Sequence, residues 1–410
     1  MYGSEKNIKH NLFLFFMDGV VFQPSMTLIS ITTVIPYFLA QLGASTFQIA
    51  LAASIALICT FMAQPIFGYL ATHAKVMHKT FGKILLLQRS IFFIFVLCIP
   101  ALIKTGAMFV WIFLFFWGLF NVFVGAYNVF HTPLVITLLP PEKRGAIRGL
   151  GYAIGSCLGL GAAALITVLL GRISFPHNYV AIFSLGLLFL FIDAFLFFFM
   201  RVREHIVPDA PTNIVRYFKE MLSSIRENVP FRTVILTCLF LVIANSLLPY
   251  YTLYAIRVFS ITESFIAALA ALAVISNAFG YIIIGVVVDR WGPKTSSVIA
   301  AILIILAGAF PLVTNSLILL SVAWVFANLG NTGYMISATL LLGEVSPPSK
   351  LPQYVGVQAT ISLAISSTIL LLLAPVLENI GFFLLFATVF VCGVVSLLIN
   401  LLVLRKQLKM

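Results

Sequence analysis

The chain alternates long apolar runs with short polar segments along its whole length. Apolar stretches of about 20 residues or more, the length of an α-helix that crosses a bilayer, recur twelve times. The predicted spans are 11–41, 47–71, 83–103, 108–137, 147–171, 178–200, 232–256, 263–288, 295–313, 316–342, 354–377 and 381–404. Several are longer than a bilayer requires, so we expect tilted or kinked helices.

The composition identifies the solvent in which these helices lie. Hydrophobic residues make up 62% of the 410 residues and charged residues 9%, whereas soluble domains carry about 25% charged residues. So few charges cannot cover the surface of a soluble monomer, and the sequence predicts an all-α integral membrane protein. The first apolar run is too long for a signal-peptide core and has no cleavage site, so we expect it to remain in the mature protein.

The positions of the lysines and arginines predict the orientation in the membrane. With the N-terminus inside, 20 of the 24 basic residues fall in cytoplasmic segments, as the positive-inside rule requires. Both termini are therefore expected in the cytoplasm. The net charge of +12 reflects this topology and indicates no nucleic-acid partner. So compact a chain is typical of a prokaryotic inner (cytoplasmic) membrane.

One hydrophilic segment divides the chain into two halves. We expect an N-terminal six-helix bundle over 1–200, a cytoplasmic linker over 201–231 and a C-terminal six-helix bundle over 232–410. The linker sequence "TNIVRYFKEMLSSIREN" gathers its apolar residues on one helical face, which predicts an amphipathic helix on the inner leaflet. A solvated linker is the alternative.

The two halves share an internal repeat. The fourth and tenth spans align without a gap at an offset of 207 residues, and the loops that follow them read "PPEK" and "PPSK". The aligned pairs are Trp117 and Trp324, Asn121 and Asn328, Tyr127 and Tyr334, and Thr132 and Thr339. Six-helix halves in parallel orientation are typical of two-bundle transporters with a site near the bilayer midplane.

The stretch "GVVVDRWGPKT", from Gly285 to Thr295, resembles the G-x-x-x-D-R-x-G-x-[RK] signature of the major facilitator superfamily. The resemblance implies that family's fold, with twelve transmembrane helices in two six-helix bundles. It also implies a conformational latch on the cytoplasmic side, formed by Gly285, Asp289, Arg290 and Lys294. Simple anchoring by positive charge is the alternative for this loop.

The first half carries an incomplete copy of this signature. Gly68 is present in "GYLATHAKVMHKTFGK", but Thr72 and His73 stand where the acid and the arginine would be. We therefore expect an asymmetric latch to which the first half contributes Gly68.

Four ionisable residues lie within the predicted spans of the first half: Asp18, Arg89, His131 and Asp193. A charge inside the membrane is unfavourable unless it is paired or faces water, so each is a functional candidate. In this architecture the first helix lines the central cavity, so Asp18 is the candidate for proton or cation coupling. Arg89 and Asp193 are expected to form a structural pair. The alternative is a permanent salt bridge between Asp18 and Arg89.

Polar side chains on the predicted cavity helices are candidates for substrate binding. Buried carboxamides and hydroxyls need hydrogen-bond partners, which a substrate can supply. The candidates are Gln23, Asn121, Asn128, His131, Asn245, Tyr250, Tyr254, Asn328 and Asn331. Hydrogen bonding between helices is the alternative role for the same residues.

These observations favour a secondary transporter and give no sign of an enzyme, a metal site, a cofactor or an ATP-driven motor. The expected partners are a small-molecule substrate, protons or another cation, and the lipid bilayer, with the protein acting as a monomer. The aromatic, charge-poor interior favours proton-coupled efflux of an amphipathic or drug-like compound. The absence of the family's antiporter signature in the fifth span weighs against this. Nutrient uptake by symport and a non-transporting receptor are the alternatives.

Overall fold

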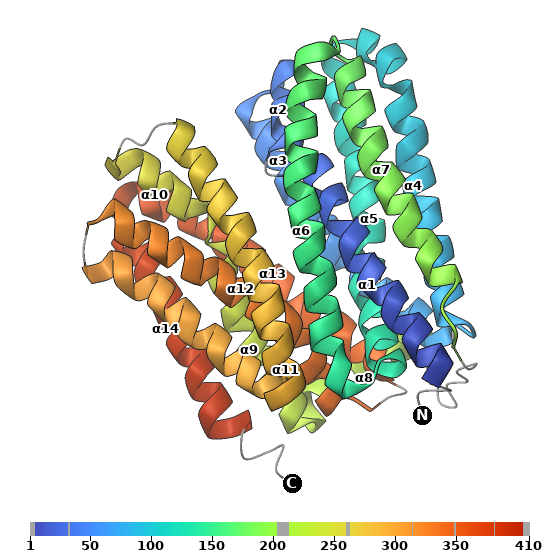
Figure 1. Cartoon of the computed structure of the whole chain (residues 1–410), viewed down its shortest axis with the longest axis vertical. Coiled ribbons are helices and arrows are strands. Elements are labelled where there is room, and N and C mark those ends of the chain that lie inside the picture. Colours follow the sequence, from blue (N-terminus) through green and yellow to red (C-terminus); the bar gives the residue numbers. More distant parts are fainter. Residues whose placement is uncertain are drawn as a thin grey trace. The chain divides into compact units, whose positions relative to one another are not determined.

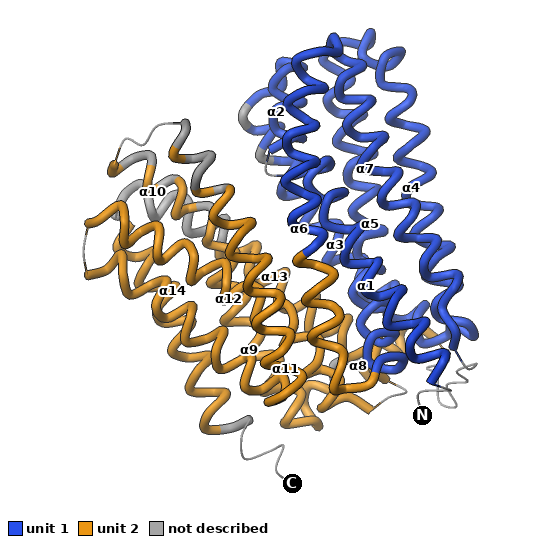
Figure 2. Tube along the Cα trace, viewed as in Figure 1, with its two compact units in different colours: residues 1–139, 154–210 blue, residues 140–153, 211–410 orange. Residues whose placement is uncertain are grey.

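The computed structural model describes residues 5–31, 33–202, 213–259, 263–313, 315–347, 350–380 and 382–404. Every regular element in these ranges is a helix (Figure 1). The chain divides into two compact units (Figure 2). Unit 1 comprises residues 1–139 and 154–210, and unit 2 comprises residues 140–153 and 211–410. Part of the predicted linker, residues 203–212, lies outside the described residues.

Unit 1 is built from seven α-helices, of which α6 has its first turns in unit 2. They are α1 (Glu5–Leu28), α2 (Val34–Gln41), α3 (Thr46–His73), α4 (Met77–Leu102), α5 (Ala107–Leu138), α6 (Pro141–Arg172) and α7 (His177–Phe198). Ser45 begins α3 with a capping box, in which its side chain accepts from the Gln48 backbone and the Gln48 side chain accepts from Ser45. Such reciprocal bonds satisfy amide groups that a helix start leaves free.

The remaining helices belong to unit 2. They are α8 (Ile214–Glu227), α9 (Val229–Ser246), α10 (Pro249–Phe259), α11 (Glu263–Val313), α12 (Leu317–Val345), α13 (Leu351–Ile380) and α14 (Phe383–Ile399), and a π-helical turn, η3 (Asn400–Leu404), follows. The long helix α11 is interrupted at Gly292, where φ is 81°. A residue with a side chain rarely adopts this conformation, so glycine allows the sharp break between the two predicted spans 263–288 and 295–313.

The first predicted span of each half forms two helices instead of one. The range 11–41 contains the end of α1 at Leu28 and the start of α2 at Val34. The range 232–256 likewise contains α9 and then α10, which begins at Pro249. Proline has no amide hydrogen to donate to the preceding turn, so it favours a helix start. Both ranges are therefore interrupted, which goes further than the kinks expected for such long spans.

Nine helical stretches in the described part of the chain are long and apolar enough to cross a membrane, judged by length and composition. One of them, Ala271–Val313, contains the interruption at Gly292. The protein is therefore a multi-pass, all-helical membrane protein.

Aromatic side chains fill much of the core of unit 1. Phe38 of α2 is fully buried and makes edge-on contacts with Phe109, Phe113 and Phe183. Helix α7 packs against α1 and α4, and α4 packs against α5. These contacts bring residues of four helices together at one point in the unit.

Unit 2 has a core of its own. Helix α11 packs against α12 and α14, and α9 packs against α12, α13 and α14. Ile284 and Val288 of α11 contact Ile336 and Leu340 of α12 in a buried apolar cluster.

Candidate functional site

The first candidate site is a buried polar contact in unit 1. The Nε2 atom of His131 lies 3.0 Å from Oδ2 of Asp18, and the Tyr127 hydroxyl donates to Oδ1 of the same carboxyl at 3.1 Å. Only 2% of Asp18 is exposed. Tyr127 and His131 stand four residues apart on α5, so both side chains lie on the face that meets α1.

A second ion pair lies beside this contact. Arg89 of α4 donates to Oδ2 of Asp193 of α7 at 2.6 Å, and the two residues are 2% and 0% exposed. The carboxyl groups of Asp193 and Asp18 are close enough to act on each other electrostatically. The four ionisable residues singled out in the sequence therefore form one group, in which Arg89 bonds to Asp193 and His131 to Asp18.

Aromatic rings surround the imidazole of His131. The Tyr127 ring stacks on it with centroids 4.8 Å apart, and Phe15 and Phe197 meet it edge-on. The Phe22 ring in turn stacks on the ring of Tyr127. This apolar shell lowers the local dielectric, which strengthens every charge interaction inside it. In the described residues no three His, Cys, Asp or Glu side chains are placed to hold a metal ion.

The repeat places the same hydrogen bonds in both units. The Trp117 indole donates to a backbone carbonyl of α3 at 3.0 Å, and the Asn121 amide donates to the Trp117 carbonyl at 2.8 Å. In unit 2 the Trp324 indole donates to a carbonyl of α11 at 2.9 Å, and Asn328 donates to the Trp324 carbonyl at 2.8 Å. One donor of each of the two amides is therefore used within the unit.

Two further amide side chains of unit 2 differ from Asn328 in their surroundings. Its Oδ1 atom accepts from Asn277 of α11 at 3.4 Å. Both polar side-chain atoms of Asn245, on α9, are buried and have no hydrogen-bond partner among the described residues. A buried amide without partners is unfavourable. Asn245 is therefore the residue of this group best suited to bind a polar ligand.

The remaining cavity candidates lie in varied surroundings. Tyr254 is buried and its hydroxyl donates to Oδ1 of Asn315 at 2.9 Å, while Asn128 is exposed. The three others are partly buried: Gln23, Tyr250 and Asn331. Gln23 lies against Gly155 of α6.

The signature loop forms a well-defined contact within unit 2. The Asp289 carboxylate accepts from the backbone amides of Gly145 and Ala146, each at 2.7 Å, in the first turns of α6. Gly285, one turn earlier on α11, approaches Gly145 so closely that an added Cβ would lie 2.5 Å from its carbonyl oxygen. A carboxylate near a helix N-terminus is stabilised by the helix dipole. A side chain at position 285 would separate the two helices.

The other latch candidates lie around this contact or in the other unit. Arg290 is exposed and Lys294 is partly buried; Gly68 is buried in α3 of unit 1.

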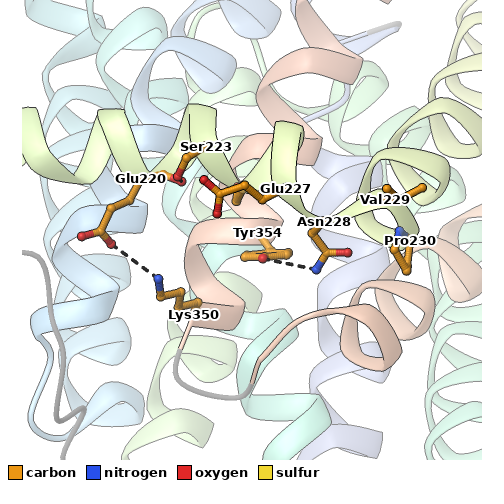
Figure 3. Close-up of a pocket in the computed structure, with 9 residues that line it drawn as sticks. Glu220, Ser223, Glu227, Asn228, Val229, Pro230, Lys350 and Tyr354 are labelled. Carbon is orange, nitrogen blue, oxygen red and sulfur yellow. Dashed lines mark hydrogen bonds and ion pairs between the residues drawn. The ribbon is translucent and has the colours of Figure 1, made fainter.

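A polar pocket of about 450 Å³ lies where α8, α9 and α13 of unit 2 meet (Figure 3). Glu220 of α8 lies 3.7 Å from Lys350, and the Asn228 amide lies 3.3 Å from the Tyr354 hydroxyl. These contacts attach the linker helix α8 to the start of α13. The apolar side chains at 218, 221 and 222 of the expected amphipathic face lie outside the described residues.

Two contributors to these sites were not among the candidates read from the sequence. Tyr127 donates to Asp18, and Asn277 donates to Asn328. The position of Tyr127, one helical turn before His131 and inside the repeat, was the available signal. Asn277 stands in an otherwise apolar run, which is a similar signal.

Comparison with known proteins identifies the fold. The outward-facing bacterial homologue of the iron transporter ferroportin is similar with a TM-score of 0.74 and 14% identity, over 95% of this chain and 98% of that chain. The proton:xylose symporter bound to 6-bromo-6-deoxy-D-glucose is similar with a TM-score of 0.73 and 14% identity, over 99% and 97%. The E. coli fucose:proton symporter is similar with a TM-score of 0.67 and 16% identity, over 94% of this chain and 98% of that chain.

Identities this low establish the fold alone. No curated protein that was compared matches the sequence. The sequence model of the Major Facilitator Superfamily, however, matches residues 13–274 and 233–409. These two matches together cover nearly the whole chain, both units included. The chain therefore belongs to the Major Facilitator Superfamily of membrane transporters.

Proposed function

We propose that this protein is a secondary active transporter that moves a small organic solute by alternating access, coupled to protons. The observation that supports coupling most directly is the buried contact between Asp18 and His131, 3.0 Å apart. Imidazole exchanges a proton near physiological pH, and ionisable groups at membrane depth are typical of proton relays.

We further propose twelve transmembrane helices in two six-helix bundles, with both termini in the cytoplasm of a prokaryotic cell and the protein acting as a monomer. The distribution of basic residues along the sequence supports the orientation. The corresponding breaks between α1 and α2 and between α9 and α10 support two halves built alike.

The signature loop is proposed to act as the latch. Asp289 holds the first turns of α6 against α11 through two charge-assisted hydrogen bonds of 2.7 Å. Bonds from backbone amides to a carboxylate are stronger than neutral ones. They stabilise one conformation of the transport cycle and break when that side opens.

For the substrate we propose proton-coupled efflux of an amphipathic or drug-like compound, because the interior is rich in aromatic residues and the predicted cavity is poor in charge. A second candidate is uptake of a neutral polar solute by symport. The unpartnered amide of Asn245 favours it, and two proteins of similar fold are named as proton symporters of sugars.

The test is proton flux in proteoliposomes that contain a pH-sensitive dye. Lipophilic cations, sugars, organic acids, peptides and siderophores are added in turn, with and without an imposed pH gradient. We expect one class to move protons through the wild type and not through Asp18→Asn. Glu220→Gln, which removes a carboxylate from the surface of α8, is the matched control and should behave as wild type.

The direction of the proton movement separates efflux from uptake. Solute and proton moving in opposite directions indicate antiport, and movement in the same direction indicates symport. Binding of a solute without any flux would contradict the proposal and favour a receptor on the same fold.

A further inference from the structure

Four helices of unit 1 place five polar residues in one continuous contact. The residues are Asp18 (α1), Arg89 (α4), Tyr127 and His131 (α5), and Asp193 (α7); we call them the charge cluster. Arg89 contacts one carboxyl group at 2.6 Å and His131 the other at 3.0 Å, and the two carboxyl groups act on each other electrostatically. The Arg89–Asp193 pair is thus continuous with the Asp18 site and cannot be treated as a separate structural contact.

The ionisable groups of the charge cluster act on one another across the four helices. Those acting on Asp193 are Arg89, Asp18 and His131, and those acting on Arg89 are Asp193, Tyr127 and Asp18. The four ionisable members are 3% exposed or less. A proton gained or lost by one member therefore changes the proton affinity of the others.

Charge balance limits the number of protons in such a buried group. With His131 neutral and both carboxyl groups ionised, the single positive charge of Arg89 leaves one negative charge uncompensated. A net charge in a low-dielectric interior is strongly disfavoured. One additional proton makes the charge cluster neutral.

Two places in the charge cluster can hold this proton. Nε2 of His131 lies 3.0 Å from Oδ2 of Asp18. The other place is between the two carboxyl groups, because Oδ1 of Asp193 is buried and has no donor among the described residues. A protonated Asp18 carboxyl would be that donor.

We propose that the charge cluster holds one exchangeable proton, shared between His131 and the Asp18–Asp193 carboxyl pair, and that Arg89 sets this number at one. The proton enters from solvent on one side and leaves to solvent on the other. The inference rests on the proton coupling proposed above and extends it, because the coupling site becomes a charge count over five residues instead of one carboxylate.

If charge balance sets the number of bound protons, variants of Asp193, Arg89 and His131 should change proton binding in ways that a site at Asp18 alone does not predict. Asp193→Asn leaves one carboxylate balanced by Arg89, so it should abolish proton binding as fully as Asp18→Asn. Removing Arg89 as well, in Arg89→Gln/Asp193→Asn, leaves Asp18 unbalanced and should restore one proton. His131→Gln should retain one proton, held by the two carboxyl groups.

The test measures proton binding directly on the purified protein in detergent. Each variant is titrated in weakly buffered solution against Asp18→Asn as the reference, and protonated carboxyl groups are detected by infrared spectroscopy. We expect one proton per protein for wild type, His131→Gln and the double variant, and none for Asp193→Asn. His131→Gln should show a stronger carboxylic acid band than wild type.

The inference is overturned if Asp193→Asn keeps the full proton or if His131→Gln loses it. Unfolding is monitored in parallel. If Asp193→Asn does not fold, the test uses Arg89→Gln/Asp193→Asn instead, and a double variant that binds no proton also overturns the inference. Because titration needs no substrate, its result is independent of transport. If the protein binds a single proton but shows no proton-driven flux, the proposed function is refuted. If flux is proton-driven but Asp193→Asn binds a proton as the wild type does, only this inference is refuted.

Discussion

The interiors of the two units differ although the repeat gives them a common framework. Both contain a tryptophan that donates to a neighbouring helix and an asparagine that donates to that tryptophan's carbonyl. Unit 1 adds Asp18 and Asp193, the two carboxylates that are buried among the described residues. At the offset of 207 residues, His131 corresponds to Ala338, and no carboxylate in the described part of unit 2 is buried as these two are.

The difference separates two kinds of polar residue. Bonds from Trp117 and Trp324 to backbone carbonyls join helices, and a fold built twice needs them twice. Ionisable residues inside a membrane are unfavourable and persist where they have a function. Unit 1 is therefore the place to look for proton chemistry, and unit 2 for recognition of an uncharged group.

The largest expected effect comes from removing Arg89, the buried arginine that pairs with Asp193 in unit 1. Arg89→Ala should lower the free energy of unfolding by about 3–5 kcal/mol, because it leaves buried negative charge unpaired. Unfolding in mixed micelles measures this. Arg89→Gln/Asp193→Asn removes charge in pairs and should be closer to wild type. Equal stability of the two variants would show that charge balance does not decide the stability of unit 1.

The next largest effect on stability is expected at the aligned tyrosines, Tyr127 and Tyr334, and it should differ between them. Tyr127 donates to the carboxyl group of Asp18 in the charge cluster, whereas its equivalent Tyr334 lies beside the neutral amide of Gln358. Tyr127→Phe should therefore cost about 1.5–3 kcal/mol and Tyr334→Phe about 1 kcal/mol. The same unfolding assay compares them. If Tyr334→Phe were the more damaging, the charged interior of unit 1 would not be what distinguishes the two.

The aligned tryptophans should behave alike. Trp117→Phe and Trp324→Phe each remove an indole donor and leave a backbone carbonyl without it, at about 1–3 kcal/mol. Trp117 is more deeply buried than Trp324, so its loss belongs at the upper end of that range. Neither variant should change proton binding by the charge cluster. A loss of proton binding in Trp117→Phe alone would show that this framework and the chemistry of unit 1 are coupled.

The smallest effect is expected at the surface of unit 2. Lys350 is 44% and Glu220 23% exposed, with their charges 3.7 Å apart, and exposed pairs contribute below about 1 kcal/mol. Lys350→Ala should therefore leave stability nearly unchanged and lose its effect entirely in high salt, since salt screens exposed charges. Destabilisation approaching that of Arg89→Ala would mean that the docking of α8 depends on this pair.

Particular residues show how far the sequence leads. The apolar runs and the "GVVVDRWGPKT" signature were sufficient to predict the helical membrane fold and the superfamily, which the family match confirms. The same runs did not reveal that α1 ends at Leu28 and α2 restarts at Val34. Apolar residues continue through this break, and hydropathy does not distinguish one helix from two.

The partners of the buried charges were the harder part. His131 meets Asp18 across 113 residues of sequence, and Arg89 meets Asp193 across 104. Their presence in apolar spans marked them as candidates, but several pairings were compatible with similar depths in the membrane. The rotation of each helix about its axis selects among these pairings, and helix packing determines that rotation.

The sequence by itself determined the membrane as solvent, the helical class, the repeat and the identity of the ionisable residues. Each of these follows from local composition or spacing, because the hydrophobic effect and helix geometry act on short stretches of chain. The tertiary structure alone decided that four charged residues and a tyrosine share one site. Contacts between distant helices depend on how side chains interlock across whole units, and no single stretch of sequence contains that information.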